Sequence, residues 1–297
     1  MKVTVQGQGD VNLDQKDFIA AGGEGQVYCR GQTAFKIYLD PARMLPLGKI
    51  QELSRIQDPD VIKPERIILD PKQHNPIGYT MRYVADTLPL CQIFTRTFRE
   101  RNGIDHSKML ALVQHIQHMV DHIHDAGVLL VDLNELNFLV DSQFKSVYSI
   151  DVDSFQTAGY PATAIMPSVR DWSVQGNHFT EGSDWFSFAC VAYQMFTGIH
   201  PYRGKHPTVS TLEDRMRQNI SVFDPTVHVP KVVYTPDIIP SGYREWFKAV
   251  LQNGLRVHPP TNPMDAIILH VPVAIVTSQD NLTSNPCVPT PHPSFGM

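Results

Sequence analysis

Apolar and polar residues alternate in short runs over the first part of the chain, a pattern typical of strands in a sheet with one exposed face. Glycine-rich and polar turns separate these runs. Apolar residues also recur every three positions from Leu47 to Ile56, which predicts one helix. Strands are expected at residues 3–5, 18–20, 27–29, 34–39, 66–69 and 78–84.

The pattern becomes mostly helical beyond residue 107. Apolar residues at helical spacing predict a long helix from Met109 to His124, which Gly127 ends. Further strands are expected at residues 128–131, 137–140 and 147–151, and further helices at residues 185–197, 212–219 and 243–255. The mixture of strands and helices predicts an α+β fold.

Two lobes follow from this order of elements. A small β-rich lobe is expected over residues 1–84 and a larger, mainly helical lobe over residues 85–275. A cleft between two such lobes is a common nucleotide site. Residues 276–297 are rich in proline, serine, threonine and asparagine, which indicates a flexible tail or a truncated linker.

The composition argues against several classes of protein. With 297 residues, 42% of them hydrophobic and 19% charged, the chain can bury a sizeable core and does not have the composition of a disordered protein. Its net charge of −5 argues against nucleic acid or an anionic membrane as the main partner. The four cysteines stand far apart and no apolar run is long, so we expect a cytoplasmic protein without disulfides or a membrane span.

A glycine cluster and a lysine form the first candidate site. Gly22, Gly23 and Gly25 lie between two expected strands, where the backbone either approaches a phosphate closely or simply makes a hairpin turn. Lys36 is the only charged residue in its strand, and it either pairs with a phosphate or extends to the surface. Glu52, the only acid of the first expected helix, either holds Lys36 through an ion pair or faces solvent.

Four polar residues of the second lobe form the strongest candidate site. Asp132 and Asn137 lie on a turn between two expected strands, and Asp151 and Asp153 follow the next strand. Oxygen donors brought together in this way suit Mg²⁺. Each acid taken alone would also serve as a turn residue, and the spacing does not decide whether Asp151 or Asp153 is the principal metal ligand.

Taken in order, these segments resemble the protein-kinase fold over residues 11–262. IHDAGVLLVDLNELNFLVD resembles the catalytic loop, GGEGQVY the end of the glycine-rich loop, AFKIY the strand with the ATP-binding lysine, and YTMRYV the path into the hinge. SDWFSFACVAYQMFTGIHPY resembles the buried helix after the activation segment, with Asp184 as its anchoring aspartate.

This resemblance implies binding of ATP with Mg²⁺ or Mn²⁺ and gives roles to individual residues. Asp132 would be the catalytic aspartate, with Asn134 beside it to contact the γ-phosphate or Asp132. The metal would be held by Asn137, Asp151 and Asp153. The nucleotide site would be formed by Gly22, Gly23, Gly25, Val27, Lys36, Glu52, Met81 as the gatekeeper, Arg82, Tyr83 and Val84.

Within this superfamily, the segments GGEGQVY, VDLNELNFLV and IDVDSFQ are similar to bacterial kinase-like proteins of tellurite-resistance-type phosphorylation triads. That resemblance implies a PP2C-type phosphatase and a von Willebrand A protein as partners, in addition to a protein substrate.

The chain departs from the kinase pattern at several positions. Residues 130–132 read Leu-Val-Asp where His-Arg-Asp is usual, and Asn134 stands where a lysine is usual. There is no Asp-Phe-Gly triplet and no clear Ala-Pro-Glu. We therefore expect the Glu–Arg ion pair of the large lobe to be absent, although Glu181 and Arg256 leave it open.

Three functions remain open. The retained lysine, aspartates and asparagine favour an ATP- and Mg²⁺-dependent kinase of protein serine or threonine hydroxyls. The missing features favour a nucleotide-binding pseudokinase that acts as a signalling scaffold. A phosphotransferase acting on small molecules is the third, and the helix expected near residue 212 counts against it because small-molecule relatives usually rebuild that region.

Overall fold

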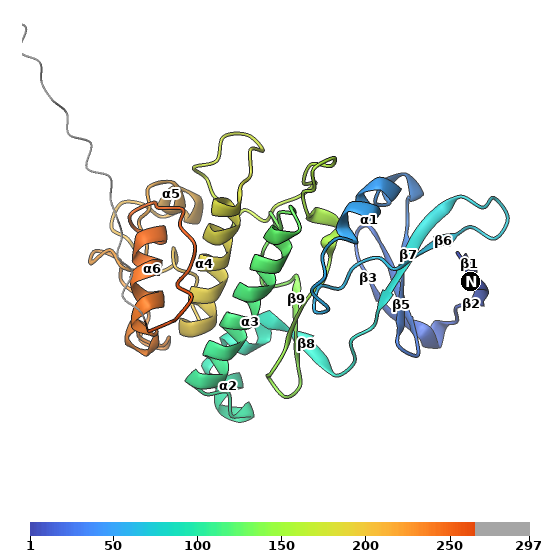
Figure 1. The fold of residues 1–297 in the computed structure, drawn as a ribbon. Coiled ribbons are helices and arrows are strands. Elements are labelled where there is room, and N and C mark those ends of the chain that lie inside the picture. The colour runs from blue at the N-terminus through green and yellow to red at the C-terminus, as the bar shows by residue number, and fades with distance from the viewer. Residues whose placement is uncertain (265–297) are drawn as a thin grey trace, which may run out of the picture. The chain divides into compact units, whose positions relative to one another are not determined.

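The computed structural model describes residues 1–264 of the 297-residue chain, and these residues belong to one compact unit (Figure 1). The end of the expected large lobe at residue 275 and the expected tail at residues 276–297 lie outside the described residues. Within residues 1–264, no helix combines the length and the hydropathy that crossing a bilayer requires.

The N-terminal part of the chain forms a seven-stranded antiparallel sheet. Its strand order is β2-β1-β6-β7-β5-β4-β3. The strands are β1 (Lys2–Val5), β2 (Gly9–Asn12), β3 (Phe18–Ala21), β4 (Gly25–Arg30), β5 (Thr33–Tyr38), β6 (Arg66–Leu69) and β7 (Pro76–Arg82). Buried apolar side chains of β1, β5 and β6 form a small core with Leu13 on one face of the sheet, as the alternating pattern predicts.

The other face of the sheet belongs to the main core. Tyr38 and Tyr79 of adjacent strands share one core cluster with Leu53 and Ile56. Leu53 ends helix α1 (Leu47–Leu53), which begins directly after Pro46. The helix is shorter than the apolar spacing predicts, and it buries Lys49 together with Leu53.

The remaining described residues, up to 264, combine a small sheet with five α-helices (Figure 1). The three-stranded sheet has the order β10-β9-β8, with β8 (Thr87–Pro89), β9 (Phe138–Asp141) and β10 (Val147–Ser149). The helices are α2 (Arg96–Asn102), α3 (His106–Asp125), α4 (Glu181–Thr197), α5 (Leu212–Arg217) and α6 (Ser241–Leu251). Short 3-10 helices occur at Gln15–Asp17, Pro41–Arg43, Leu90–Phe94, Val152–Ser154 and Pro236–Ile238.

Helix α4 is the centre of the larger lobe. It packs against α3 and α6, and almost all of its side chains are buried (Figure 1). The Thr180 side chain caps its first turn, and Gly198 ends it with a left-handed backbone. A β-rich lobe followed by a larger, mainly helical lobe confirms the expected α+β, bilobal kinase-like fold.

Residues 128–131, expected as a strand, do not form one. Leu129 makes only an isolated bridge to Gln156, and the next two amides donate to the Asp184 carboxylate instead of to a strand. The sequence pattern cannot reveal this partner because it lies more than fifty residues further along the chain. Val128, Leu130 and Val131 are buried, but apart from the bridge at Leu129 and a bend at Val131 the backbone has no regular structure.

An ion pair that the sequence does not predict connects the segment before α4 with the chain after α6. The Arg256 guanidinium donates from Nε and Nη2 to the Asp171 carboxylate at 2.5 and 2.7 Å. Asp171 is only 2% exposed. Burial raises the pKa of this carboxyl, but its bonds to Arg256 and Ser173 outweigh burial and lower the pKa overall. Arg256 therefore pairs with Asp171, and the Glu181–Arg256 pair that the sequence leaves open is not among the ion pairs of residues 1–264.

Replacing Asp171 with asparagine should lower the free energy of unfolding by about 3 kcal/mol at pH 7, because Arg256 then loses its buried countercharge. The folded-state pKa of Asp171 lies below its usual value of 3.8, so its stabilisation is complete above that value and is lost as the pH falls through the folded-state pKa. Urea unfolding from pH 7 into the acid range measures this. Asp237→Asn, in an exposed pair with Arg244, is the control and should change stability by less than about 0.5 kcal/mol. A difference for Asp171→Asn that stays constant down to the lowest pH would contradict this assignment.

Candidate active site

A pocket of about 700 Å³ is lined by residues of both lobes. Apolar side chains, among them Ala34, Ile62 and Leu139, line part of it, which suits a flat heteroaromatic ring. It contains most of the residues expected at a nucleotide site: Gly22, Gly23, Gly25, Val27, Lys36, Met81, Arg82, Tyr83, Val84, Asn137 and Asp151. Glu52, Asp132, Asn134 and Asp153 do not line it.

The three glycines of the turn before β4 have different reasons to be glycine. A Cβ at Gly25 would lie 2.5 Å from the Ile37 carbonyl oxygen, because Gly25 pairs with β5 at close range. A Cβ at Gly22 or Gly23 would meet nothing within 4 Å. The Gly22 amide donates to the Gly25 carbonyl at 2.9 Å and closes the turn. Gly25 is therefore required by the sheet, whereas the space beside Gly22 and Gly23 is open to a ligand.

Lys36 lies between two aspartates that follow strand β10. Its Nζ is 3.0 Å from Asp151 Oδ1 and 2.8 Å from Asp153 Oδ2. Burial lowers the pKa of Lys36, but the two carboxylates together outweigh burial and raise it, so the side chain is a cation. Glu52 is not its partner, because the Glu52 carboxylate accepts a bond from the Gly159 amide at 3.1 Å. The Lys36–Glu52 ion pair expected from the sequence is not present in the structure.

Asp153 is held by residues that the sequence analysis did not single out. The hydroxyls of Tyr38 and Tyr79 donate to its two carboxylate oxygens, the second at 2.8 Å. Burial is the main cause that raises the pKa of both tyrosines, and both therefore stay protonated donors at neutral pH. A signal for them exists in the sequence, since Tyr38 stands two residues after Lys36 and shares its side of strand β5.

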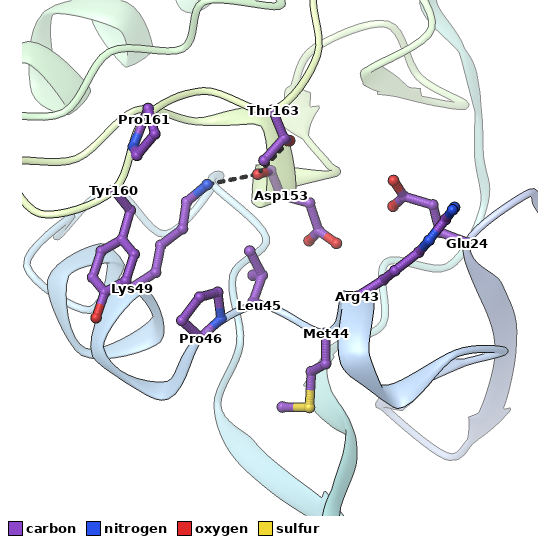
Figure 2. Close-up of a pocket in the computed structure, with 10 residues that line it drawn as sticks. All are labelled: Glu24, Arg43, Met44, Leu45, Pro46, Lys49, Asp153, Tyr160, Pro161 and Thr163. Atoms are coloured by element: carbon purple, nitrogen blue, oxygen red, sulfur yellow. Dashed lines mark hydrogen bonds between the residues drawn. The ribbon is translucent and has the colours of Figure 1, made fainter.

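Helix α1 contacts Asp153 through the backbone. The buried ammonium of Lys49 donates to the Asp153 carbonyl at 2.7 Å (Figure 2). Figure 2 also shows the cavity beside this bond, of about 520 Å³, which Asp153 and Lys49 line together with Tyr160 and Thr163. Asp151 and Asp153 therefore line two different cavities.

The turn that carries Asp132 and Asn137 brings these side chains together. Asn137 Nδ2 donates to the carbonyl of Asp132 at 3.0 Å and to its carboxylate at 3.3 Å, which leaves the Asn137 amide oxygen as the atom available to a cation. The other carboxylate oxygen of Asp132 accepts the Met166 amide at 2.7 Å. Asp132 thus lies at the edge of the pocket, hydrogen-bonded to a residue that lines it.

The structure places Asn134 inside the turn and outside the pocket. The residue is 2% exposed. Its Oδ1 accepts the Leu136 amide at 2.8 Å and its Nδ2 donates to the Asp132 carbonyl at 3.3 Å. Of the two contacts expected for Asn134, the structure shows the one with Asp132, and both polar side-chain atoms stabilise the loop.

Asp184 fixes the backbone before Asp132. This carboxylate is fully buried on helix α4 and accepts the amides of Leu130 and Val131 at 2.8 and 2.9 Å. It also lies 2.9 Å from His124 Nε2. Val131 has a positive φ of 61°, which is strained for a β-branched residue. The bonds to Asp184 hold this strained turn, and the turn sets the direction of Asp132.

Arg82, Tyr83 and Val84, at the end of β7 and directly after it, line the pocket. The Arg82 guanidinium donates to the Pro59 carbonyl at 2.6 Å and lies over the Tyr148 ring. The Tyr83 amide is bonded to the Gln32 carbonyl at 2.9 Å. Since both groups are engaged within the protein, the Arg82 side chain and the Tyr83 amide are not the contacts that a ring in the pocket would use.

Two oxygen donors in the pocket fit a magnesium ion. Asn137 and Asp151 both line the pocket, and the Asp151 side chain is 48% exposed. Mg²⁺ commonly takes one or two protein ligands and completes its shell with waters and substrate phosphates. In residues 1–264, no group of three or more histidine, cysteine or acidic side chains forms a denser metal site.

Comparison with known proteins gives distant matches. No protein-family model matches the chain. The chain is 22% identical over 139 residues to a probable serine/threonine-protein kinase of Dictyostelium discoideum, with 45% of this chain and 10% of that protein aligned. It is 24% identical over 127 residues to ribosomal protein S6 kinase alpha-3 of Homo sapiens, with 41% and 17% aligned. It is 23% identical over 220 residues to ribosomal protein S6 kinase 2 alpha of Xenopus laevis, with 67% and 29% aligned.

The aligned part covers between 10% and 29% of these three relatives' own lengths. All three are kinases by name, and their similarity supports a protein-kinase-like family for this chain.

Alanine substitutions distinguish Gly25, which the sheet requires, from Gly23, which has open space beside it. Gly25→Ala should lower the free energy of unfolding by about 2 kcal/mol, because the new Cβ meets the Ile37 carbonyl of the paired strand. Gly23→Ala is the matched control and should change stability by less than about 0.5 kcal/mol. Thermal and urea unfolding of both variants measure this. Equal losses for the two variants would show that the sheet does not distinguish these positions.

Replacing Asp184 with asparagine should lower the free energy of unfolding by about 2–4 kcal/mol, because an amide group cannot accept all three bonds and its NH₂ opposes a donor. Hydrogen exchange at the Leu130 and Val131 amides should speed up more than exchange in the core of α3. Asp125→Asn, at an exposed position at the end of α3, is the control. Unchanged protection of both amides would contradict the role given to Asp184.

Proposed function

We propose that the protein transfers the γ-phosphoryl group of ATP to serine or threonine hydroxyls of a protein substrate, with Mg²⁺ or Mn²⁺. The observation that carries this proposal is the convergence of Lys36, Asn137 and Asp151 on one pocket. These residues come from three separate segments, and the glycine turn closes the same pocket. Such a group of a cation, two oxygen donors and an open backbone turn suits a nucleotide polyphosphate.

Phosphoryl transfer asks the protein mainly to position its reactants and to stabilise negative charge. The apolar walls and the backbone near Val84 would take the adenine, and the amides near Gly22 and Gly23 would lie over the phosphates. Lys36 supplies positive charge to those phosphates. Mg²⁺, held by Asn137 and Asp151, would neutralise further phosphate charge.

Asp132 would orient the acceptor hydroxyl. Its carboxylate lies beside Asn137 and is only partly buried, so one side remains open to a substrate. The Met166 amide holds one carboxylate oxygen in place. The second oxygen has only the 3.3 Å bond from Asn137, which an incoming hydroxyl can replace.

A second candidate function is a nucleotide-binding pseudokinase that acts as a scaffold. The observation that favours it is the position of Asn134, whose side chain is used up within its own turn. No positive charge therefore replaces the lysine that the kinase pattern has at this position. In this function the pocket would bind ATP without turnover.

We also propose a cellular compartment and partner proteins for this chain. The net charge of −5 and the pattern of cysteines favour a cytoplasmic protein that works on proteins rather than on nucleic acid or membranes. The similarity of three signature segments to kinase-like members of phosphorylation triads favours a PP2C-type phosphatase and a von Willebrand A protein as partners.

Transfer of labelled γ-phosphate from ATP tests the function directly. With Mg²⁺ or Mn²⁺, we expect incorporation into the protein itself or into a generic basic protein substrate. Asp132→Asn should reduce this incorporation by about 100-fold or more, because the variant loses the group that orients the hydroxyl. ATP should raise the melting temperature of both proteins equally, since Asp132 does not line the pocket.

The outcomes separate the two candidates. Incorporation that Asp132→Asn abolishes supports the kinase. A rise in melting temperature with ATP, but no transfer to either acceptor or to proposed partners, supports the scaffold. Failure of ATP to bind would overturn both.

A further inference from the structure

We propose that Asp153 is the residue that positions Lys36, and that Asp151 alone of the two aspartates is available to a metal ion. This inference rests on the proposed nucleotide-binding function and deepens it. It gives Asp153 the task that the sequence pattern assigns to Glu52, and it removes Asp153 from the expected set of metal ligands.

The Asp153 carboxylate is fully engaged within the protein. Oδ2 accepts Lys36 Nζ at 2.8 Å and the hydroxyl of Tyr38, and Oδ1 accepts the hydroxyl of Tyr79 at 2.8 Å. The residue is 8% exposed. A metal ion at this carboxylate would have to displace donors from both oxygens and leave them unsatisfied in the core. The carboxylate also lines the cavity of Figure 2 and not the pocket that holds Asn137.

Asp151 has the opposite surroundings. Its only side-chain hydrogen bond in the described part of the chain is the one from Lys36 at 3.0 Å. Its left-handed backbone, with φ of 63°, turns it into the pocket that Asn137 also lines. The two acids therefore have different environments. Asp151 is exposed and lines the same pocket as Asn137, the second oxygen donor, whereas Asp153 is buried among three protein donors.

Asp153 is itself fixed from two directions. Tyr38 and Tyr79 lie on neighbouring strands of the large sheet, so the sheet that carries Lys36 also carries the donors that hold its partner. From helix α1, Lys49 holds the Asp153 carbonyl at 2.7 Å (Figure 2). Helix α1 thus acts on Lys36 through Asp153, because Glu52 of the same helix is bonded to Gly159 instead.

The test is ATP binding by the full chain, measured by calorimetry in EDTA and again in Mg²⁺. Asp153→Asn should weaken ATP binding about 10-fold or more in both conditions, because Lys36 loses its buried partner and no longer meets the phosphates in a fixed position. Asp151→Asn should leave the affinity in EDTA within about twofold, or improve it, and should reduce the gain in affinity that Mg²⁺ gives.

A double-mutant cycle with Lys36→Met separates positioning from a general structural role. In the Lys36→Met background, Asp153→Asn should have almost no further effect on ATP affinity. Asp151→Asn should still reduce the Mg²⁺-dependent gain in that background. Melting temperatures measured alongside show whether each variant is folded.

Tyr79→Phe is the second variant, for the case that Asp153→Asn does not fold. It removes one donor to Asp153 and keeps the ring in the core. It should weaken ATP binding about 3- to 10-fold in EDTA, and this effect should also vanish in the Lys36→Met background.

Distinct results would overturn the inference and the function on which it rests. If the wild-type protein does not bind ATP, the proposed function fails and the inference fails with it. If the wild type binds ATP but Asp153→Asn adds its full effect to Lys36→Met, only the inference fails. The same holds if Asp153→Asn reduces the Mg²⁺-dependent gain as Asp151→Asn does, or if Glu52→Gln rather than Asp153→Asn shows coupling to Lys36.

Discussion

Within residues 1–264, a buried carboxylate that has no arginine or lysine partner determines the geometry of the loop that carries Asp132. Asp184 is fully buried in helix α4, and burying an ionised carboxylate is costly unless its oxygens accept strong hydrogen bonds. The two backbone amides before Asp132 supply those bonds. Helix α4 in turn packs against α3 and α6. The position of Asp132 therefore depends on the apolar core of the larger lobe, through one side chain.

Buried carboxylates that accept bonds from distant donors also fix the segment that leads from β10 to α4. Asp153 holds its beginning against the large sheet, Asp171 holds its later part through Arg256, and Asp184 holds the loop that faces it. Each of these carboxylates accepts donors that are more than fifty residues away along the chain. The segment between them has little regular structure, so fixed polar contacts replace secondary structure in giving it a defined course.

The sequence predicts what depends on local pattern and misses what depends on distant partners. The apolar spacing around Leu112 and Phe188 suffices to predict α3 and α4, because amphipathic and buried helices have a regular period. Lys36 and Asp151 stand out because charged residues at or beside apolar strands are unusual. Glu52 is misassigned because the residue types of a helix do not reveal its distant partners; the Glu52 carboxylate accepts the Gly159 amide, and Lys49 contacts Asp153. The Asp171–Arg256 pair, 85 residues apart, has no local signal at all.

The 85-residue separation of Asp171 and Arg256 has a consequence for the synthesis of the protein. A chain leaves the ribosome from its N-terminus, so Asp171 emerges well before Arg256. During that interval the nascent lobe holds a carboxylate at a position that is buried in the finished fold and has no cation to match it. The ion pair can form only after Arg256 has been translated. A chain that ends before Arg256 therefore leaves the segment around Asp171 without its buried ion pair.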